Sequence, residues 1–240
     1  MRKSGFFPAL VYRELLLCKK SMVICLVSMG IFSLVPILAI LSLKYGNLAM
    51  LPQDILTGIR SNNDLMLTLY AVISPCMLVL SISDASVFDA QIKWDRFRRS
   101  TPVTPVRLAL GKYVFYLIVL AVSVALSVFM MWLCHALLGT PMTRTDFAVI
   151  MALIMVISIL SVLAQVLIMT FRSVDKGMLA MIGCVAAVFF LLPNEWRTGF
   201  SVEWLLGMVE KLLPWSPAIL GAALLLGFGL TVCVYKRRER

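Results

Sequence analysis

The chain has 240 residues, of which 61% are hydrophobic and only 14% are charged. Soluble globular proteins average roughly 45–50% apolar and about 25% charged residues, so a water-soluble monomer is close to excluded. The formal net charge of +10 must be explained by where the basic residues lie relative to the apolar segments.

The first segment, residues 5–20, is predicted to be a helix that lies along the membrane surface. It contains Phe6, Phe7 and several leucines, and it ends in Lys19 and Lys20, which suit the level of the lipid headgroups. Its apolar stripe is ragged because Glu14 interrupts it. A disordered basic tail is the alternative interpretation.

Long runs without Asp, Glu, Lys or Arg follow this segment. A membrane-spanning helix needs about 20 mainly apolar residues, and in lipid the backbone must satisfy its hydrogen bonds within the segment. Six segments meet this requirement, which predicts an all-α polytopic membrane protein. The predicted spans are residues 21–43, 65–88, 108–139, 147–171, 177–194 and 214–235.

Six spans would place both termini on the same side of the membrane, and Lys and Arg are enriched in cytoplasmic loops. The termini and the loops on their side carry 17 of the 22 Lys and Arg residues. The other side carries five, namely Lys44, Arg60, Arg144, Arg197 and Lys211. Both termini are therefore predicted to be cytoplasmic. The basic excess then reflects topology and anionic lipid, so no nucleic-acid partner is needed to explain it.

The segment 89–107, between the second and third predicted spans, holds the densest charge in the chain. Gln91–Arg99 can form a short helix, and Pro102 and Pro105 predict a turn after it, because each disfavours helix at the residue before it. Pro105 then suits the first turn of a new helix with Thr104 as its N-cap. The order of helix, Pro-turn and helix favours a docking element for a soluble partner. A basic loop lying on anionic lipid is the alternative.

Two carboxylates lie at the inner end of the second span. Asp84 and Asp89 approach the bilayer core, where charges are costly and usually functional. Lys93 follows Asp89 by four residues, a spacing that allows an ion pair on a helix. We expect a structural role, bracing the docking element, for these residues: Asp84, Asp89, Arg107 and Lys112. Contact with substrate is the second interpretation.

The outer segment 198–213 is predicted to be a helix at the other membrane surface. Glu203, Gly207 and Glu210 recur at helical spacing and form a narrow polar stripe on an otherwise apolar helix. Trp204 belongs at the level of the headgroups. The candidate residues of an outer gate are Glu203, Trp204 and Glu210. A passive interfacial helix is the alternative.

The sequence lacks the motifs of a catalytic or metal site. No G-x-x-x-x-G-K-[ST] phosphate-binding motif is present, and the six cysteines form no C-x-x-C pair. The single histidine, His135, lies late in the third span, where both a packed interfacial role and a proton-sensitive role are open. We expect no cofactor and no metal in this chain, so any ATPase must be a separate chain.

The turn after the docking element resembles the cytoplasmic segment of ABC-2 type exporter permeases. The matching residues are Thr101–Arg107, which read T-P-V-T-P-V-R, and Gly111–Tyr113. The family usually has Leu where Thr101 stands, and Pro105 is a further departure. The resemblance implies a type V exporter-like permease that pairs with a second permease chain, identical or different, and with two ATPase chains that bind ATP and Mg. It also implies an outer segment that is interfacial or re-entrant.

By the same resemblance, the docking element is the coupling helix that sits in a groove of the ATPase. Its contact residues are then Lys93, Trp94, Asp95, Arg96, Phe97, Arg98 and Arg99. The small bacterial members of the family that this chain resembles export amphipathic peptides, including cytolytic and antimicrobial ones, across the cytoplasmic membrane. The resemblance therefore implies ATP-driven export of an amphipathic peptide or lipid-like substrate.

Two other functions stay open. An ion-coupled secondary transporter would carry ionisable groups at mid-membrane and inverted repeats, and neither is clear in the sequence. A non-transporting membrane scaffold or immunity protein would need no ATPase, and changes at Trp94 or Arg98 would then be harmless.

Overall fold

The computed structural model describes residues 6–45, 77–79, 83–91, 103–139, 141–191, 211 and 213–239. Every named element within these ranges is helical, which confirms the predicted all-α class. The elements are α1 (Phe6–Tyr45), α3 (Ser83–Gln91), α5 (Pro105–Leu138), α6 (Arg144–Phe171), α7 (Val174–Leu191), the 3-10 helix η2 (Leu213–Trp215) and α10 (Ser216–Glu239).

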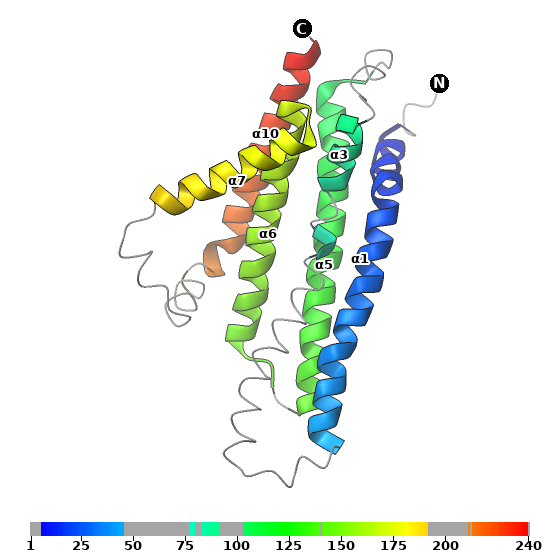
Figure 1. The fold of residues 1–240 in the computed structure, drawn as a ribbon, viewed down its shortest axis with the longest axis vertical. Helices are drawn as coiled ribbons and strands as arrows, with labels where there is room; N and C mark the ends of the chain where they lie inside the picture. The colour runs from blue at the N-terminus through cyan, green and yellow to red at the C-terminus, as the bar shows by residue number, and fades with distance from the viewer. Residues whose placement is uncertain are drawn as a thin grey trace.

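Helix α5 stands at the centre of the described bundle (Figure 1), with α1 along one side and α6 and α10 along the other. The short α3 lies beside α1 and α6 near the end of the bundle where α5 begins, and α7 leaves the bundle at a steep angle. Helix α1 begins and α10 ends at this same end. That arrangement is the one required if both termini share one side of a membrane; which side that is stays a prediction.

Four of the described helices are long and apolar enough to cross a membrane. They comprise Pro8–Ser42, Pro105–Leu137, Asp146–Phe171 and Ser216–Arg237, and they correspond to the predicted spans one, three, four and six. Helix α7 covers most of the predicted fifth span but is not among the four. Most of the predicted second span and the outer segment 198–213 lie outside the described residues, so the count of six spans stays a prediction.

Helix α1 differs from the prediction of an interfacial helix followed by a separate span. It runs without interruption through Lys20 and Ser21, where the first helix was expected to end. The physical reason is that no Pro or Gly occurs between Pro8, in the first turn, and Gly30. Its 40 residues correspond to about 60 Å of helix, about twice the thickness of a hydrocarbon core.

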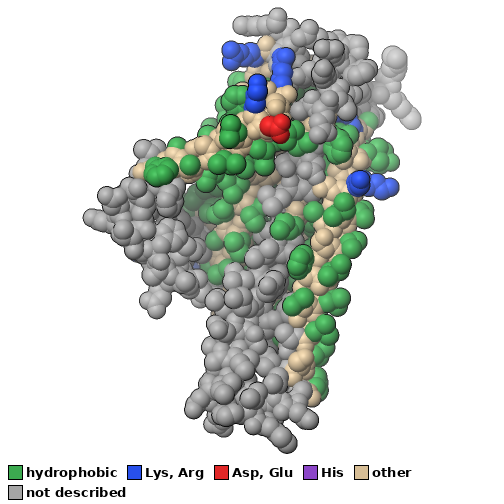
Figure 2. All heavy atoms as spheres, viewed as in Figure 1, with side chains coloured by type: hydrophobic (Ala, Val, Ile, Leu, Met, Phe, Trp, Pro, Cys, Tyr) green, Lys and Arg blue, Asp and Glu red, His purple; other side chains and the backbone are tan. Residues whose placement is uncertain are grey.

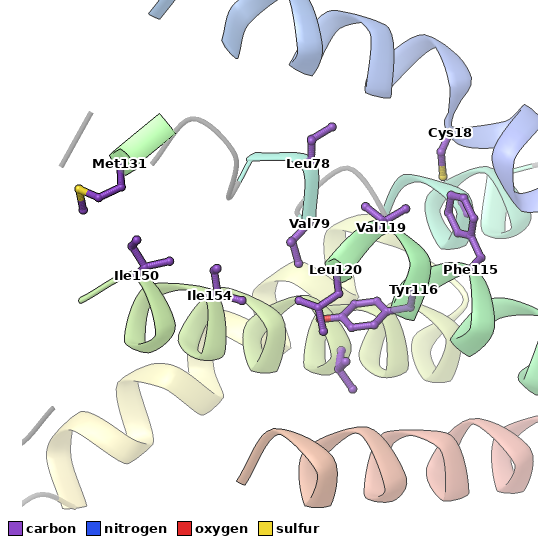
Figure 3. Close-up of a cluster of buried hydrophobic side chains, with 12 residues drawn as sticks. Cys18, Leu78, Val79, Phe115, Tyr116, Val119, Leu120, Met131, Ile150 and Ile154 are labelled. Carbon is purple, nitrogen blue, oxygen red and sulfur yellow. The ribbon is translucent and has the colours of Figure 1, made fainter. Parts of the chain in front are cut away.

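The main core forms where α1, α5 and α6 meet the helical residues 77–79. In Figure 3, Cys18 of α1 approaches Phe115 of α5, while Leu78 points toward α1 and Val79 points away from it. Two hydrogen bonds tie this core together. The Tyr116 hydroxyl donates to the Ser158 carbonyl at 3.0 Å, and the Ser161 hydroxyl donates to the Val79 carbonyl at 3.3 Å.

The connection between α5 and α6 is short and capped at both helix ends. Helix α5 begins at Pro105, as predicted, with Thr104 in the extended N-cap conformation but without a side-chain capping bond. It ends at Gly139, whose φ of 74° suits a left-handed C-cap. Helix α6 begins with a capping box in which Thr143 and Asp146 exchange hydrogen bonds. His135 Nε2 lies 3.2 Å from Asp146 Oδ2, so the histidine joins the two helices at this turn.

The outer surface of the bundle is apolar over most of its length. Figure 2 shows hydrophobic side chains along the whole visible face of α1 and along α7, whereas Lys and Arg gather mainly toward the end where α10 finishes. Exposed side chains on α1 include Val27, Ile31 and Leu38, and those on α7 include Leu179 and Phe190. Apolar surface of this extent suits contact with lipid and would be unstable in water.

One glycine fixes the contact between α6 and α7. Gly177 is buried, and a Cβ atom built on it would lie 2.7 Å from the Cα of Ile168 and 2.8 Å from its backbone nitrogen. Since these are backbone atoms of α6, they cannot turn aside as a flexible side chain could. Gly183, on the same helix, has nothing within 4 Å of its would-be Cβ.

We therefore predict opposite effects for two identical substitutions on α7. Gly177→Ala should destabilise the protein by about 1–3 kcal/mol through overpacking, whereas Gly183→Ala should be neutral or stabilising by up to about 1 kcal/mol through helix propensity. Thermal unfolding in detergent, followed by tryptophan fluorescence, measures both variants. Equal unfolding temperatures for the two would show that α7 does not pack on α6 in this way.

Candidate functional site: a ring of four buried charges

Among the residues that the structure describes, four charged side chains from three helices meet at the end of the bundle where α1 begins and α10 ends. Arg13 and Glu14 come from α1, Asp89 comes from α3, and Lys112 comes from α5. We call this set the charge ring. Its formal charges sum to zero, because two cations face two carboxylates.

The ring is closed, and each carboxylate uses both of its oxygens. Glu14 Oε1 accepts from Arg13 Nη1 at 2.7 Å, and Glu14 Oε2 accepts from Lys112 Nζ at 3.0 Å. Asp89 Oδ1 accepts from Arg13 Nη2. Asp89 Oδ2 lies 2.8 Å from Lys112 Nζ as an ion-pair contact without hydrogen-bond geometry. Positive and negative groups therefore alternate around the ring.

Burial makes this alternation necessary. The side chains of Lys112 and Glu14 are only 4% and 5% exposed, and those of Asp89 and Arg13 are 11% and 19% exposed. A buried charge costs several kcal/mol unless it is paired and hydrogen-bonded. Each charge in the ring has two opposite neighbours, which offsets much of that cost.

Close packing of α1 on α5 brings the ring residues within reach of one another. Gly111, directly before Lys112, is buried against α1, and a Cβ atom on it would lie 3.0 Å from the Cβ of Leu10. The absence of a side chain at Gly111 thus lets the two helices approach closely beside the ring. Leu108 and Ala109 of α5 add an apolar layer near the same end, together with Met169 of α6.

Helix α10 is seated beside the ring by contacts to the residue after Lys112. The Tyr113 ring meets Phe228 edge-on with centroids 5.6 Å apart, and its hydroxyl lies 3.4 Å from the Thr231 hydroxyl. Gly227 leaves room for this contact, because a Cβ on it would lie 2.6 Å from the Tyr113 hydroxyl oxygen. Helices α1 and α10 are therefore both closely packed on α5 at the end of the bundle that holds the ring.

Two residues of the ring lie on the helices that precede and follow the predicted docking element. Asp89 lies near the end of α3, which finishes at Gln91, and Lys112 lies in the third turn of α5, which starts at Pro105. The chain between these helices contains the residues predicted to contact a soluble partner. The Lys112–Asp89 contact joins the two helices from which this segment emerges, which we call its base. Arg13 and Glu14 attach this base to α1.

The structure brings two of the four predicted bracing residues together in the ring, and their bracing role stays a prediction. Asp89 and Lys112 do form ion pairs, and they pair with each other. Arg107 is exposed on the first turn of α5 and belongs to none of the ion pairs among the described residues. The pair of Asp89 with Lys93 that the sequence spacing allows lies outside the described residues, and the described partners of Asp89 are Arg13 and Lys112.

Several predicted site residues fall outside what the structure describes. The side chain of Asp84, which lies on α3, is one of them. The coupling residues Lys93, Trp94, Asp95, Arg96, Phe97, Arg98 and Arg99 and the outer-gate residues Glu203, Trp204 and Glu210 are the others.

Sequence reasoning missed Arg13 and Glu14 as members of the site. The signal was present, since Glu14 breaks the apolar stripe of its helix, and an acidic residue among leucines is costly unless it finds a cation. The partner could not be identified from the sequence, because Lys112 lies 98 residues further along the chain.

Comparison with known families identifies the chain. The family model described as "ABC-2 family transporter protein" matches residues 9–235. The chain belongs to the ABC-2 transporter family. The resemblance seen in Thr101–Arg107 is thereby confirmed, and the protein is a multi-pass membrane permease of an ABC transporter, a transport component that is not itself catalytic. No curated protein and no solved structure gives a significant match.

Family membership gives the charge ring its context. An ABC-2 permease implies an ABC ATPase as a partner in a membrane setting. The segment between α3 and α5, whose base the ring closes, is the one that we predicted to contact such a partner.

We predict that removing the lysine of the ring severely destabilises the permease. Lys112→Met leaves Glu14 and Asp89 buried with Arg13 as the remaining cation of the ring, and breaking a buried ion pair in this way costs about 3–5 kcal/mol. The same substitution at Lys176, exposed on α7, should change stability by no more than about 0.5 kcal/mol. The free energy of unfolding of both variants is measured in detergent. If the ring does not contribute to stability, the two variants will have equal free energies of unfolding.

Proposed function

We propose that the chain is the membrane-spanning subunit of an ATP-driven exporter. A separate ATPase chain hydrolyses ATP, and the coupling helix of this permease, Lys93–Arg99, transmits the resulting movement to the spans. Two permease chains, identical or different, work with two ATPase chains, and ATP and Mg are bound by the ATPase alone. The proposed location is the bacterial cytoplasmic membrane with both termini in the cytoplasm.

Family membership over residues 9–235 is the observation that carries this proposal. The architecture of the described helices agrees with it, because the segment that would meet the ATPase is fastened at its base to α1, α3 and α5. A partner that pushes or pulls on this segment would act on helices long enough to cross a membrane.

An amphipathic cargo is proposed from the charge distribution of the spans. Between Lys20 and Lys44, between Lys112 and His135, and between Asp146 and Arg172, the chain has no ionisable acid or base other than cysteine and tyrosine. A pathway lined by such helices suits a peptide with a large apolar face, such as a cytolytic or antimicrobial peptide, or a lipid-like molecule.

The same distribution argues against the ion-coupled secondary transporter. Such transporters place ionisable or ion-coordinating groups near the middle of the membrane. Within the described helices, the ion-paired residues lie near helix ends: Arg13 and Glu14 early in α1, Lys112 early in α5, and His135 late in α5. The alternative of a scaffold or immunity protein is tested by asking whether an ATPase co-purifies with the chain.

The proposal predicts that an ATPase co-purifies with the permease and depends on the coupling helix. The tagged full chain is purified from membranes of its own host, and ATP hydrolysis by the eluate is measured. Truncating a Trp or Arg side chain at the centre of an interface to alanine often costs about 2 kcal/mol or more of binding free energy. The double variant Trp94→Ala with Arg98→Ala should therefore lower the retained ATPase at least about tenfold.

A matched control uses the same residue types at the other end of the bundle. Trp132 and Arg144 are exposed near the α5–α6 turn, and changing both to alanine should leave the retained ATPase unchanged. If no ATPase co-purifies with the wild-type chain, the exporter proposal is wrong and a scaffold becomes the better description. If both double variants retain the same amount of ATPase, the ATPase does not bind through Lys93–Arg99.

A further inference from the structure

We propose that the charge ring makes α1 move together with the coupling segment, so that Arg13, Glu14, Asp89 and Lys112 are the positioning residues through which ATPase movement reaches the first span. This inference rests on the proposed function and goes beyond it, because it assigns the transmission step to a particular set of side chains. None of the four needs to touch ATP, the ATPase or the cargo.

The first step is the way in which the ring connects three helices. Lys112 contacts carboxylates from both α1 and α3, and Arg13 also contacts α3. The two helices that flank residues 92–102 in the sequence, α3 and α5, are thereby attached to α1 as well as to each other. A displacement of the segment cannot pull α3 and α5 away from α1 without separating buried opposite charges, which is costly in a low-dielectric site.

The second step is that α1 is continuous. Because no break separates the ring from the part of α1 that is long and apolar enough to span a membrane, a tilt imposed at Glu14 reaches Leu38, about 36 Å away along the helix. Two separate helices joined by a loop would absorb such a tilt. The uninterrupted helix is therefore what allows a contact at one end to act on the other.

The third step is the difference between the two ends of the α1–α5 contact. At the far end, Ile40 packs with Met130 and Cys134 in a small apolar cluster of described residues. Apolar contacts of this kind are non-directional, so they allow one helix to slide past another. At the near end, the alternating charges fix α1 relative to α5 in one register. In the proposed transmission, movement that starts at the ring shifts α1 along this apolar contact at the far end.

The test compares two charge-balanced double variants of the permease bound to its ATPase. Glu14→Gln with Lys112→Gln removes the link between α1 and α5, and Arg13→Gln with Asp89→Asn removes the link between α1 and α3. Each pair deletes one cation and one anion, so the two remaining charges of the ring still face each other. Lys20→Gln with Asp175→Asn is the matched control, since both of these residues are exposed.

Movement of α1 is measured without any cargo. Nitroxide labels are attached to cysteines introduced at Leu38 of α1 and Leu225 of α10, which are 60% and 73% exposed, in a chain whose native cysteines are replaced by alanine. The distance between the labels is measured by pulsed electron resonance with and without ADP and vanadate. The retained ATPase and its rate of ATP hydrolysis are measured on the same samples.

In the wild-type complex and the exposed control, the distance should change when the nucleotide is trapped. In both ring variants, this change should be lost, although the ATPase still binds and hydrolyses ATP. Lys112→Arg, which keeps the charge, should preserve the change. If the ring only stabilised the fold, its loss would lower ATPase binding and ATP hydrolysis together with the distance change.

Other outcomes overturn the inference without touching the exporter proposal. If the ring variants keep the nucleotide-dependent change, or if the wild-type distance does not respond while the ATPase is bound, the ring does not transmit movement to α1. If the amide variants do not fold, Glu14→Leu with Lys112→Met decides, because it removes the same link and leaves no buried polar group from that pair. Failure of any ATPase to bind the wild-type chain would instead contradict the proposed function.

Discussion

Burying four full charges side by side is unfavourable unless each faces opposite charges, and this constraint organises the end of the bundle that carries both chain ends. The contacts of Glu14, Asp89, Arg13 and Lys112 require α1, α3 and α5 to meet at one point. A shift of one helix by a turn, about 5.4 Å, would separate Lys112 from its carboxylates. Apolar packing along lipid-exposed helices tolerates many registers, whereas this ring tolerates one.

The position of α5 at the centre of the bundle follows from the same requirement. Lys112 faces α1 and α3, while the next residue, Tyr113, faces Phe228 and Thr231 of α10, and Tyr116 reaches the Ser158 carbonyl of α6. Polar contacts therefore leave α5 in several directions within little more than one turn. Missing side chains at Gly111 and Gly227 make room for the neighbouring helices at this level.

The sequence predicts much of the fold but only part of the site, and the residues show why. Apolar runs and the start of α5 at Pro105 are local properties, and they are correctly predicted. The ring depends on contacts between residues 76 and 98 positions apart, which helical periodicity cannot reveal. The continuity of α1 was missed because Lys19 and Lys20 suggested a membrane boundary, although a cluster of charge does not by itself end a helix.

The two ends of α5 contact the neighbouring helices through different kinds of interaction, and this difference agrees with the proposed transmission of movement. At one end, four charges link segments that are distant in the sequence, so the contact is specific and directional. At the other end, α5 is joined to α6 by a short turn that combines a left-handed Gly139, the Thr143–Asp146 capping box and His135. Among the residues that the structure describes, α1 meets α5 there in an apolar cluster around Ile40. Helices α5 and α6 are thus linked by polar and capping contacts at that end, whereas the described contact of α1 with α5 there is apolar. The proposed transmission of movement would use this combination, a directional attachment of α1 beside the coupling segment and an apolar contact at the other end.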